Sequence, residues 1–438
     1  MQFKKLDTDI SDAVLVDLFC RADYGFALDS TLSFGSLGGW SFYGSDPFEI
    51  VHGDKGISAF RDLLAQYSLE THIDIPFIGG AVGFFSYDYG RFIEKLPSVA
   101  KDDLETPPFL FGLYDGIVAK NHSTGAVYLV ASEVYESANS SFKRLEEQLN
   151  KRFELKSTEA KFSFGNWEWN TSEDKFCESV NRIRSWIASG DVYQVNLSRR
   201  REAEFFGDTV ALYQALRKGN PAPYSGFFNA KELRLISTSP EQFIKKEGNR
   251  LVTRPIKGTR PRGVSASEDR ALAKDLALSE KDRAELLMIV DLERNDLGRV
   301  AEFGSISADT QYTIEYYESV MHATAEVRAT LLPDKDFLDV VQALFPGGSI
   351  TGAPKVRAME IIDTLEPNRR GVYCGSFGYI GFNQNAELNI SIRTLQHVKN
   401  RLFYSVGSGI VWDSDPKDEY DETVAKGKAI EDTLSALC

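Results

Sequence analysis

Hydrophobic and polar residues alternate over short stretches in the first third of the chain, and glycines separate these stretches. The segments 34–44 (FGSLGGWSFYG) and 79–91 (GGAVGFFSYDYGR) show the pattern most clearly. Alternation with a period of two is typical of half-buried strands, and glycine clusters mark the turns between them. Charged residues then recur at helical spacing over 137–156 (SANSSFKRLEEQLNKRFELK). We therefore predict strands and turns followed by a helix.

A polar segment at 156–174 (KSTEAKFSFGNWEWNTSED) follows this helix and is the best candidate for a linker. Polar stretches between periodic segments are typical of loops. We place a boundary near residue 160, which predicts an N-terminal region of residues 1–160 and a second region of residues 161–438.

The second region mixes both kinds of pattern. The segments 234–253 and 402–412 read as strands, whereas 268–299 and 353–366 read as helices. Hairpin-like strands grouped with helices predict an α+β fold, in which helices surround large, mainly antiparallel sheets. A Rossmann fold is disfavoured because no G-x-G-x-x-G follows a first strand.

Composition narrows the class of protein. The 438 residues are 42% hydrophobic and 26% charged, which is typical of a globular protein, and the longest apolar stretches, such as 286–290, are too short to span a membrane. The N-terminus lacks the apolar core of a secretory signal. A formal charge of −14 disfavours nucleic-acid binding. We expect a cytoplasmic protein with reduced thiols at the four scattered cysteines, which are Cys20, Cys177, Cys374 and Cys438.

Two predicted helices carry acidic residues on partly apolar stripes. Asp282 and Glu285 lie one turn apart in the first, and Glu419 and Glu422 lie one turn apart near the C-terminus. Four carboxylates that met at one point would suit Mg²⁺, which prefers oxygen ligands. The same spacing also fits solvated helix faces or ion pairs with neighbouring basic residues, and spacing alone leaves both interpretations open.

Two glycine-rich segments are candidates for ligand binding. In 345–360 (FPGGSITGAPKVRAME), Pro354 opens a helix whose exposed amides suit an anion. A nucleotide-binding P-loop is disfavoured because Ala353 stands where that motif requires lysine. In the second segment, residues 407–409 (GSG) are expected to form a strand bulge that a ligand could approach closely. Plain turns remain the alternative for both.

A basic loop at 253–262 (TRPIKGTRPR) holds four cations between prolines that stiffen it. A lysine beside other cations has a lowered pKa, because its charged form is disfavoured, and its neutral amine becomes available as a nucleophile. Lys257 is therefore a candidate nucleophile, with Arg254, Arg260 and Arg262 as the neighbouring cations. The alternative is a solvated basic turn.

Taken together, these motifs resemble the chorismate-utilising enzymes, a family that includes anthranilate synthase component I, aminodeoxychorismate synthase component I, isochorismate synthase and salicylate synthase. The resemblance covers nearly all of residues 170–435 in order. It rests on the segments GDVYQVNLSRR (190–200), STSPEQF (237–243), RPIKGTRPRG (254–263), AELLMIVDLERNDLGRV (284–300), FPGGSITGAPKVRAMEIIDTLEP (345–367), YCGSFGYIG (373–381), NISIRT (389–394) and GSGIVWDSDPKDEYDET (407–423). It implies two large antiparallel sheets packed as a sandwich and surrounded by helices.

The resemblance also implies roles for individual residues. Glu285 and Glu422 match Mg²⁺ ligands, and Glu419 and Asp282 match acidic neighbours that bind through water, although Asp282 is usually glutamate in anthranilate synthases. Positions that match the substrate site hold the enolpyruvyl carboxylate (Arg393, Tyr373), surround the ring carboxylate (Gly407, Ser408, Gly409, Lys426) or lie elsewhere in the active site (Ser349, His322, Thr259). His322 is equally compatible with a structural histidine.

Two positions separate members of the family. At the position that matches Gln194, isochorismate and salicylate synthases have a lysine. By this resemblance, glutamine at that position implies that ammonia is the nucleophile. Anthranilate synthases typically read PIAGT, whereas PIKGT, with Lys257, resembles the aminodeoxychorismate synthases. The implied reaction converts chorismate to 4-amino-4-deoxychorismate, for 4-aminobenzoate and folate synthesis. Glu241 would protonate the departing C4 hydroxyl, and Lys257 would add at C2. Ammonia would then attack C4 and expel the lysine from C2.

The resemblance further implies a partner. Both regions together fill the chain without a glutaminase domain, so we expect ammonia from a separate glutamine amidotransferase subunit. In the N-terminal region FALDS, 26–30, resembles the family's tryptophan-pocket element, with Ser30 at the serine position. The alternatives are anthranilate synthase component I and, in another class, a non-catalytic sensor that binds chorismate or tryptophan.

Overall fold

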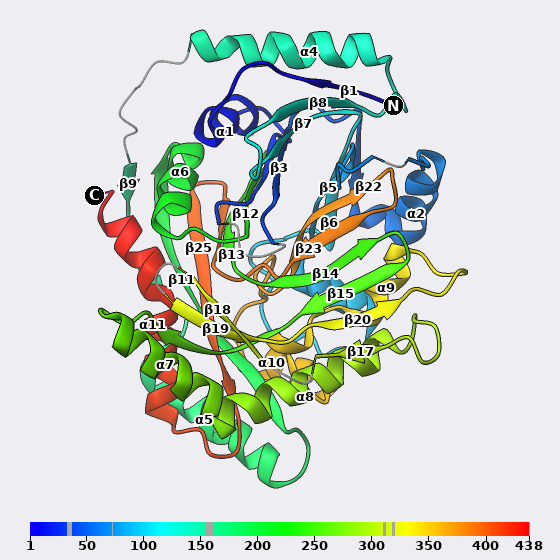
Figure 1. Cartoon of the computed structure of the whole chain (residues 1–438). Coiled ribbons are helices and arrows are strands. Elements are labelled where there is room, and N and C mark those ends of the chain that lie inside the picture. The colour runs from blue at the N-terminus through cyan, green and yellow to red at the C-terminus, as the bar shows by residue number, and fades with distance from the viewer. Residues whose placement is uncertain (33–36, 72, 155–161, 310–311, 318–319, 438) are drawn as a thin grey trace.

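The computed structural model of the chain describes residues 1–32, 37–71, 73–154, 162–309, 312–317 and 320–437 (Figure 1). Its fold is α+β, as the sequence predicts, with two large antiparallel sheets and helices around them. No helix of the described ranges is both long and apolar enough to cross a membrane. Cys20, Cys177 and Cys374 are free thiols, as predicted, and Cys438 lies outside the described residues.

The first sheet includes both the first and the last strand of the described chain. Its main path runs β1 (Gln2–Lys5), β8 (Val127–Ala131), β7 (Gly116–Asn121), β3 (Trp40–Gly44), β2 (Phe26–Asp29), β12 (Tyr224–Ala230), β13 (Leu233–Ser239), β24 (Thr394–Val398), β25 (Arg401–Ile410), β11 (Gln194–Gly207) and β10 (Glu168–Trp169). Two short strands, β9 (Phe162–Phe164) and β21 (Gly352–Ala353), also pair with β11.

The second sheet lies against the first. Its order is β17 (Ser307–Ala308), β20 (Val327–Thr330), β15 (Arg250–Arg254), β14 (Gln242–Glu247), β23 (Ala386–Asn389), β22 (Ser376–Gly381), β5 (Gly80–Phe85), β6 (Phe109–Tyr114) and β4 (Glu49–His52). A smaller third sheet, which the sequence did not predict, joins β16 (Ile256–Pro261), β19 (Val320–Thr324) and β18 (Thr313–Tyr316). It carries the basic loop.

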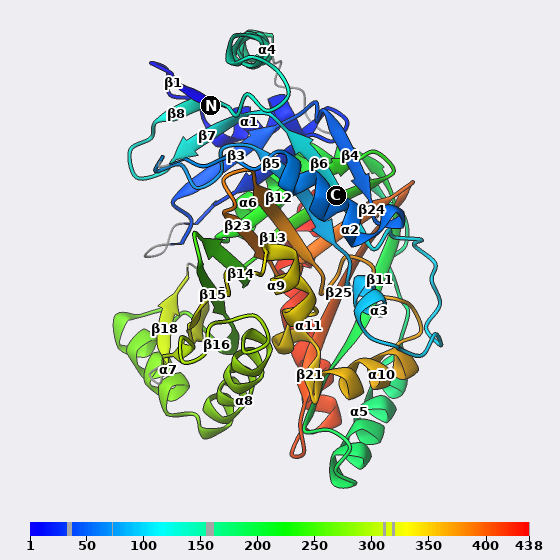
Figure 2. The same ribbon diagram turned by 90° about the vertical axis from the view of Figure 1, so that its right-hand side faces the viewer.

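Helices follow the strands along the chain and cover the outer faces of the sheets (Figures 1 and 2). They are α1 (Asp12–Cys20), α2 (Gly56–Gln66), α3 (Gly90–Ile93), α4 (Ala138–Asn150), α5 (Glu173–Ala188), α6 (Thr209–Gly219), α7 (Ala266–Leu278), α8 (Glu280–Leu297), α9 (Phe337–Leu344), α10 (Lys355–Leu365) and α11 (Pro416–Ser435). Short 3₁₀ turns are η1 (Gly53–Lys55), η2 (Tyr87–Tyr89), η3 (Lys151–Phe153) and η4 (Gly348–Ile350).

The core is layered. Aromatic side chains join the inner faces of the two large sheets, as in the pairs Phe42–Tyr379 and Phe84–Phe228, whose ring centroids are 5.8 and 6.5 Å apart. Helices α1, α4, α6 and α11 bury apolar residues on the outer face of the first sheet. Helices α2, α8 and α9 bury apolar residues in the cluster that includes the second sheet, and α10 packs against β11 of the first sheet. This arrangement is the predicted sandwich, because each sheet buries both faces.

Both large sheets contain strands from either side of the predicted boundary. Strand β2 pairs with β12, and β5 pairs with β22. The two regions therefore share their sheets and their core. The boundary near residue 160, in the predicted linker, lies outside the described residues, and the division into 1–160 and 161–438 stays a prediction.

The helical pattern at 268–299 forms two helices, not one. Ser279 separates α7 from α8, and its hydroxyl accepts a hydrogen bond from the Asp282 amide at 3.2 Å. Serine in an extended conformation satisfies an orphan amide of the first turn, which is why a helix starts there. The break directs α8 as a separate element toward the site.

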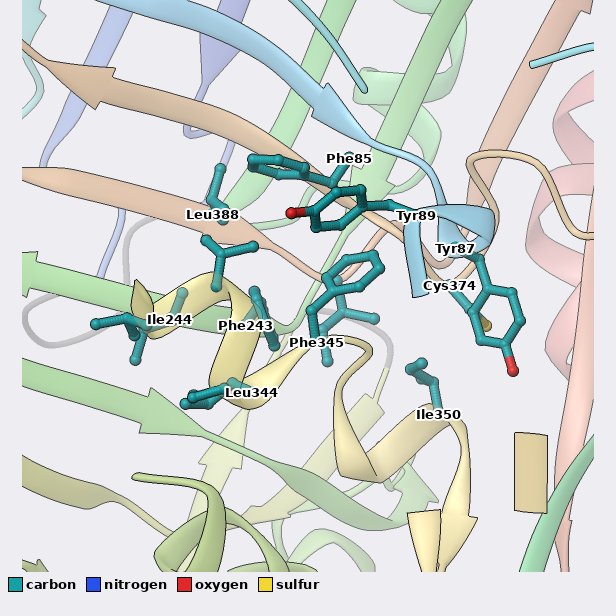
Figure 3. Packing of buried hydrophobic residues seen from close by; sticks show 14 of the residues in the cluster. Phe85, Tyr87, Tyr89, Phe243, Ile244, Leu344, Phe345, Ile350, Cys374 and Leu388 are labelled. Atoms are coloured by element: carbon teal, nitrogen blue, oxygen red, sulfur yellow. The ribbon is translucent and has the colours of Figure 1, made fainter. Parts of the chain in front are cut away.

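Phe345 connects the core to the glycine-rich segment that follows it. Its ring packs against Phe85 and Tyr89 of the N-terminal region and against Phe243 of β14, with centroid distances of 6.2, 5.7 and 5.9 Å (Figure 3). Aromatic pairs at these distances contribute beyond their buried area. The start of the segment 346–351 is thus held rigidly by residues from both regions.

A buried ion pair closes the other end of this segment. Glu366 and Arg370 are 6% and 4% exposed, and their charged atoms are 2.7 Å apart. Glu366 also accepts hydrogen bonds from the amide and hydroxyl of Ser198, and Arg370 donates to the Ile350 and Asn196 carbonyls. Because every charged group here has partners, the pair fixes β11 against the segment.

We expect Glu366→Ala to lower the free energy of unfolding by about 3–5 kcal/mol, because it leaves the Arg370 guanidinium buried without a counter-charge. The control is Asp432→Ala, which breaks an i,i+4 pair with Lys428 that is 62–72% exposed and should cost less than about 0.5 kcal/mol. Urea denaturation measures both. Equal losses would contradict the structural role given to the buried pair.

Candidate active site

Most of the predicted site residues come together at one place. Gln194 begins β11, and Gly407, Ser408 and Gly409 lie near the end of β25, directly beside it in the ladder. Helix α11 starts just after β25 and brings Glu419, Glu422 and Lys426, whereas Lys257 lies in β16 and Glu285 in α8. Figure 2 shows α8 and β16 on one side and β11, β21 and β25 on the other.

Lys257 points toward the glycine-rich segment. Its Nζ donates to the Ser349 carbonyl at 3.1 Å and lies 3.8 Å from the position of a Cβ atom built on Gly409. Burial lowers the pKa of Lys257, and the positive charge of Lys426 lowers it further, against the opposing influence of Glu285 and Glu241. The neutral amine that a nucleophile requires is therefore favoured.

The sequence predicted this lowered pKa for a reason that is wrong. The three arginines of the loop do not face Lys257, because each is paired with a carboxylate. The pairs are Arg254–Glu315, Arg260–Asp282 and Arg262–Asp269. Desolvation, and a lysine from a distant helix, lower the pKa instead.

Gly258 gives β16 the shape that presents Lys257. It has φ +79°, in the left-handed region, and the pairing register with β19 shifts between Lys257 and Thr259. A Cβ atom built on it would lie 2.7 Å from the Leu276 side chain and 2.9 Å from that of Asp282. Only glycine accommodates both the backbone conformation and the contact with α8.

The expected bulge at 407–409 is not present, because β25 pairs with β11 in unbroken register through these residues. Instead, the two glycines allow neighbouring polar groups to lie close to the backbone of β25. A Cβ on Gly409 would lie 2.7 Å from Gln194 Nε2, and one on Gly407 would lie 3.2 Å from the Tyr373 hydroxyl. Lys426 Nζ donates to the Gly407 carbonyl at 3.0 Å. The missing side chains leave backbone accessible beside these polar groups.

Several buried polar atoms at this place have no hydrogen-bond partner among the described residues. A buried polar group without a partner costs about 1–3 kcal/mol, so such a cluster indicates groups that a ligand would satisfy. The atoms are Gln194 Nε2 and Oε1, Ser349 Oγ, Ser408 Oγ, His322 Nε2 and Glu419 Oε2. All five residues were predicted from the sequence.

Glu241 lies between β13 and β14 and is 4% exposed. Its Oε1 accepts a long hydrogen bond of 3.4 Å from the Ile256 amide. Burial raises its pKa, and the neighbouring Ser349 hydroxyl and Lys257 ammonium only partly offset this. A carboxyl with a raised pKa can serve as a general acid, and that role for Glu241 stays a prediction.

The four acidic residues lie on α8 and α11 as predicted. Burial raises the pKa of Glu285 and of Glu419, and the negative charge of Glu422 raises both further. Burial would also raise the pKa of Glu422 itself, but Lys426, 2.6 Å away, lowers it. Asp282 is paired with Arg260 at 3.0 Å. The charge of Glu422 on α11 thus reaches Glu285 on α8.

These oxygens suit a hard cation chemically, and Glu419 Oε2 is buried without a partner. Within the described ranges, however, no three His, Cys, Asp or Glu side chains are gathered closely enough to hold a metal ion. Lysines provide the positive charge instead. Lys281, which the sequence analysis missed because it lies on an ordinary polar helix face, influences Glu285, Glu419 and Glu422. Metal binding would require these lysine contacts to loosen.

Arg393 and His322 form a second polar group. Arg393 has φ +48°, a conformation that costs about 1–3 kcal/mol for a residue other than glycine and that is frequent at functional sites. No carboxylate of the described residues forms an ion pair with its guanidinium, and burial lowers its pKa. A buried cation of this kind suits an anionic ligand.

His322 is 3% exposed, and its Nδ1 is 2.8 Å from the hydroxyl of Thr259. Burial, followed by the charge of Arg393, lowers the pKa of His322 to about 3. The ring is therefore neutral near pH 7, and its buried Nε2 has no hydrogen-bond partner among the described residues.

Ser30 lies away from this place, in a cavity of about 110 Å³ between the two large sheets. Its hydroxyl donates to the Pro223 carbonyl at 3.1 Å. Phe42, Tyr379 and the charged residue Lys245 also line the cavity. Aromatic walls with a few polar groups suit a small aromatic ligand, and tryptophan binding at Ser30 stays a prediction.

A desolvated lysine, a buried carboxyl, accessible glycine backbone and an unpaired arginine around unpartnered polar atoms define the active site of an enzyme that acts on a small anionic substrate. Comparison with known proteins agrees with this class. The model of the chorismate binding enzyme family matches residues 33–432, and the chain belongs to this family.

Named relatives refine the comparison. The chain is 40% identical over 420 residues to aminodeoxychorismate synthase component 1 of Bacillus subtilis (strain 168), covering 91% of this chain and 89% of the relative. It is 43% identical over 354 residues to the Salmonella typhimurium protein of the same name, covering 81% and 76%. Anthranilate synthase component I from Streptococcus pneumoniae TIGR4 has a similar structure, with a TM-score of 0.80, 31% identity and coverage of 91% and 92%.

We expect Gly258→Ala to be far more destabilising than Gly248→Ala. Both glycines have positive φ, but a Cβ at Gly248 meets nothing within 4 Å, so that change should cost only the strain of about 1–2 kcal/mol. Gly258→Ala also overpacks the contact with α8, which should lower the free energy of unfolding by about 1–3 kcal/mol more. Urea denaturation of both variants tests this, and equal losses would contradict the tight contact.

Proposed function

We propose that the chain is the chorismate-aminating component of an aminodeoxychorismate synthase, which converts chorismate and ammonia to 4-amino-4-deoxychorismate. The observation that carries this is Lys257, whose desolvated amine lies beside Gln194, Ser349 and Gly409. The two relatives of the same name, at 40% and 43% identity, support it. The product would supply 4-aminobenzoate and hence folate synthesis.

In this proposal the dianionic substrate is bound by positive and hydrogen-bonding groups. Arg393 and the Tyr373 hydroxyl bind the enolpyruvyl carboxylate. Lys426 and the backbone of 407–409 bind the ring carboxylate, with Ser408 as a donor. These contacts use Arg393, which has no carboxylate partner among the described residues, and Ser408 Oγ, which has no hydrogen bond there. They also explain how a protein with a formal charge of −14 could attract an anion.

The reaction divides between two buried groups. Glu241, in its protonated form, gives its proton to the C4 hydroxyl, which leaves as water while the Lys257 amine forms a bond to C2 and both ring double bonds shift toward C4. Ammonia then forms a bond to C4, both double bonds shift back, the C2–nitrogen bond to Lys257 breaks, and the new amine returns a proton to Glu241. The raised pKa of Glu241 favours its protonated form, and the lowered pKa of Lys257 favours its neutral amine, so both shifts are in the direction that the reaction requires.

Glu285 and Glu422 would hold Mg²⁺ directly, and Glu419 and Asp282 would bind it through water. The ion, when bound, supplies Lewis acidity at the ring carboxylate. Ammonia would come from a separate glutamine amidotransferase subunit. The names of the relatives as component 1 support a partner of this kind. The second candidate, anthranilate synthase component I, is favoured by the Streptococcus pneumoniae structure.

The first experiment is to incubate the chain with chorismate, MgCl₂ and an ammonium salt, adding aminodeoxychorismate lyase to half of the sample. We expect 4-aminobenzoate only with the lyase, and a Lys257 peptide that carries chorismate less one water after rapid acid quenching. Lys257→Ala should lose both signals. Lys246→Met is the control, because Lys246 is also a buried lysine with a lowered pKa but donates to Gln384 instead.

Chromatography with mass spectrometry identifies the products. Anthranilate and pyruvate formed without the lyase would show the second candidate to be correct. Chorismate binding without turnover, even with a glutaminase subunit present, would favour a non-catalytic sensor. Full activity of Lys257→Ala would overturn the covalent step while leaving the substrate class intact.

Metal binding is tested separately, with Mn²⁺ as a spectroscopic substitute for Mg²⁺. We expect Glu285→Gln and Glu422→Gln to weaken Mn²⁺ binding by about 10-fold or more, since each removes a charged oxygen ligand. Asp291→Asn, on the solvent side of α8 and 61% exposed, should bind Mn²⁺ like the wild type. Electron paramagnetic resonance measures free Mn²⁺ directly. Unchanged binding in both glutamate variants would place the metal elsewhere.

A further inference from the structure

Glu293 is a buried acidic residue to which the proposed reaction gives no role. It lies on α8, two turns beyond Glu285, and is 3% exposed. Its Oε1 accepts a hydrogen bond from the Gly348 amide at 3.1 Å, and its Oε2 has no partner among the described residues. Burying a carboxyl group without full hydrogen bonding costs on the order of several kcal/mol of free energy. A purely structural position would be filled more cheaply by an apolar residue.

The surroundings of Glu293 fix it in place. Asp296, one turn further along α8, is paired with Lys355, and Lys355 also donates to the Leu344 carbonyl at 2.6 Å. One lysine thus joins α8 to the end of α9 and the start of α10. Burial raises the pKa of Glu293 to about 7, against the opposing charge of Lys355. The part of α8 that carries the Glu293 carboxyl is therefore fixed to α9 and α10 through Lys355.

Gly348 is adapted to this contact. A Cβ atom built on it would lie 2.6 Å from the Leu292 side chain and 3.2 Å from Glu293 Oε1. The absence of a side chain lets the turn 347–350 lie directly against α8, where its amide meets the carboxyl. Phe345 holds the chain just before this turn through its aromatic contacts (Figure 3).

The same turn touches both groups of the proposed chemistry. The Ser349 carbonyl accepts the hydrogen bond from Lys257 Nζ at 3.1 Å. The Ser349 hydroxyl lies beside Glu241 and affects its pKa. One residue of the turn thus lies between the amine and the carboxyl, so a displacement of the turn would move the partners of both.

We propose that Glu293 is a positioning residue, which holds the turn 347–350 through the Gly348 amide and thereby sets Lys257 and Glu241 relative to each other. The effect on catalysis rests on the proposed function. The effect on the environment of Lys257 does not, and the two are measured separately.

The first test measures Lys257 without turnover. Trinitrobenzenesulfonate modifies neutral amines, and peptide mass spectrometry follows its reaction with Lys257. In Glu293→Leu the Gly348 amide loses its acceptor, the turn shifts, and the Ser349 carbonyl no longer stabilises the ammonium form. The pKa of Lys257 falls and labelling becomes about threefold faster or more. Glu293→Gln keeps an acceptor oxygen and should label within about twofold of the wild type.

Asp363→Leu is the matched control. Asp363 is also a buried helical acid, 4% exposed, that accepts a backbone hydrogen bond, from Val99 at 2.8 Å. This change should destabilise the protein without altering the labelling of Lys257. Should Glu293→Leu not fold, Glu293→Ala, whose cavity admits water, should change labelling in the same direction. Wild-type labelling rates in the leucine or alanine variant would overturn the proposal.

The second test uses steady-state kinetics with chorismate. A misplaced amine and acid should lower kcat of Glu293→Leu by roughly 10- to 100-fold. KM should stay within about threefold, since Arg393 and Tyr373 do not lie on the turn. Altered labelling with unchanged kcat would overturn the catalytic part of the proposal. If the wild type itself does not turn over chorismate, the proposed function fails, while the labelling result still decides the positioning role.

Discussion

Strands β11 and β25 pair in unbroken register from Val195–Ile410 to Glu204–Arg401, and the site depends on this ladder. It places Gln194 beside Gly409 although the two are far apart in sequence. Helix α11 leaves the same end, and the buried guanidinium of Arg199 lies 3.8 and 4.2 Å from the ring centroids of Trp169 and Tyr420. Such cation–π contacts are strongest when desolvated. The ladder therefore fixes both the glycine backbone and the helix that carries the acidic residues.

Burial is the second constraint, and it shifts the pKa values of several site residues. The same low-dielectric surroundings lower the pKa of Lys257 and raise those of Glu241 and Glu285, because each charged form is poorly solvated. Burial thus shifts the pKa of the amine and the pKa of the carboxyl toward each other. The family is recognisable from the sequence, but these shifts are a property of the packed interior.

Local features were predictable because they depend on neighbours in sequence. The i,i+3 spacing of Asp282 and Glu285 places both on one side of α8, and Pro354 stands at the start of α10 as expected. Alternation predicted the strands, and their grouping with helices predicted the α+β class. The ordered motifs placed Lys257, Gln194 and Glu422 in one site, and the structure brings these elements together.

The tertiary structure decided what depends on residues distant in sequence. The arginines near Lys257 were expected to lower its pKa, yet each is neutralised by a carboxylate that local sequence could not identify, and burial takes over their effect. The bulge expected at 407–409 is absent because β11 imposes its register. Glu293 looks like the other acidic residues of α8 in the sequence, but in the structure it is 3% exposed and accepts a hydrogen bond from the Gly348 amide. Sequence spacing determines which side chains share a face, whereas burial and partners are set only when separate elements pack.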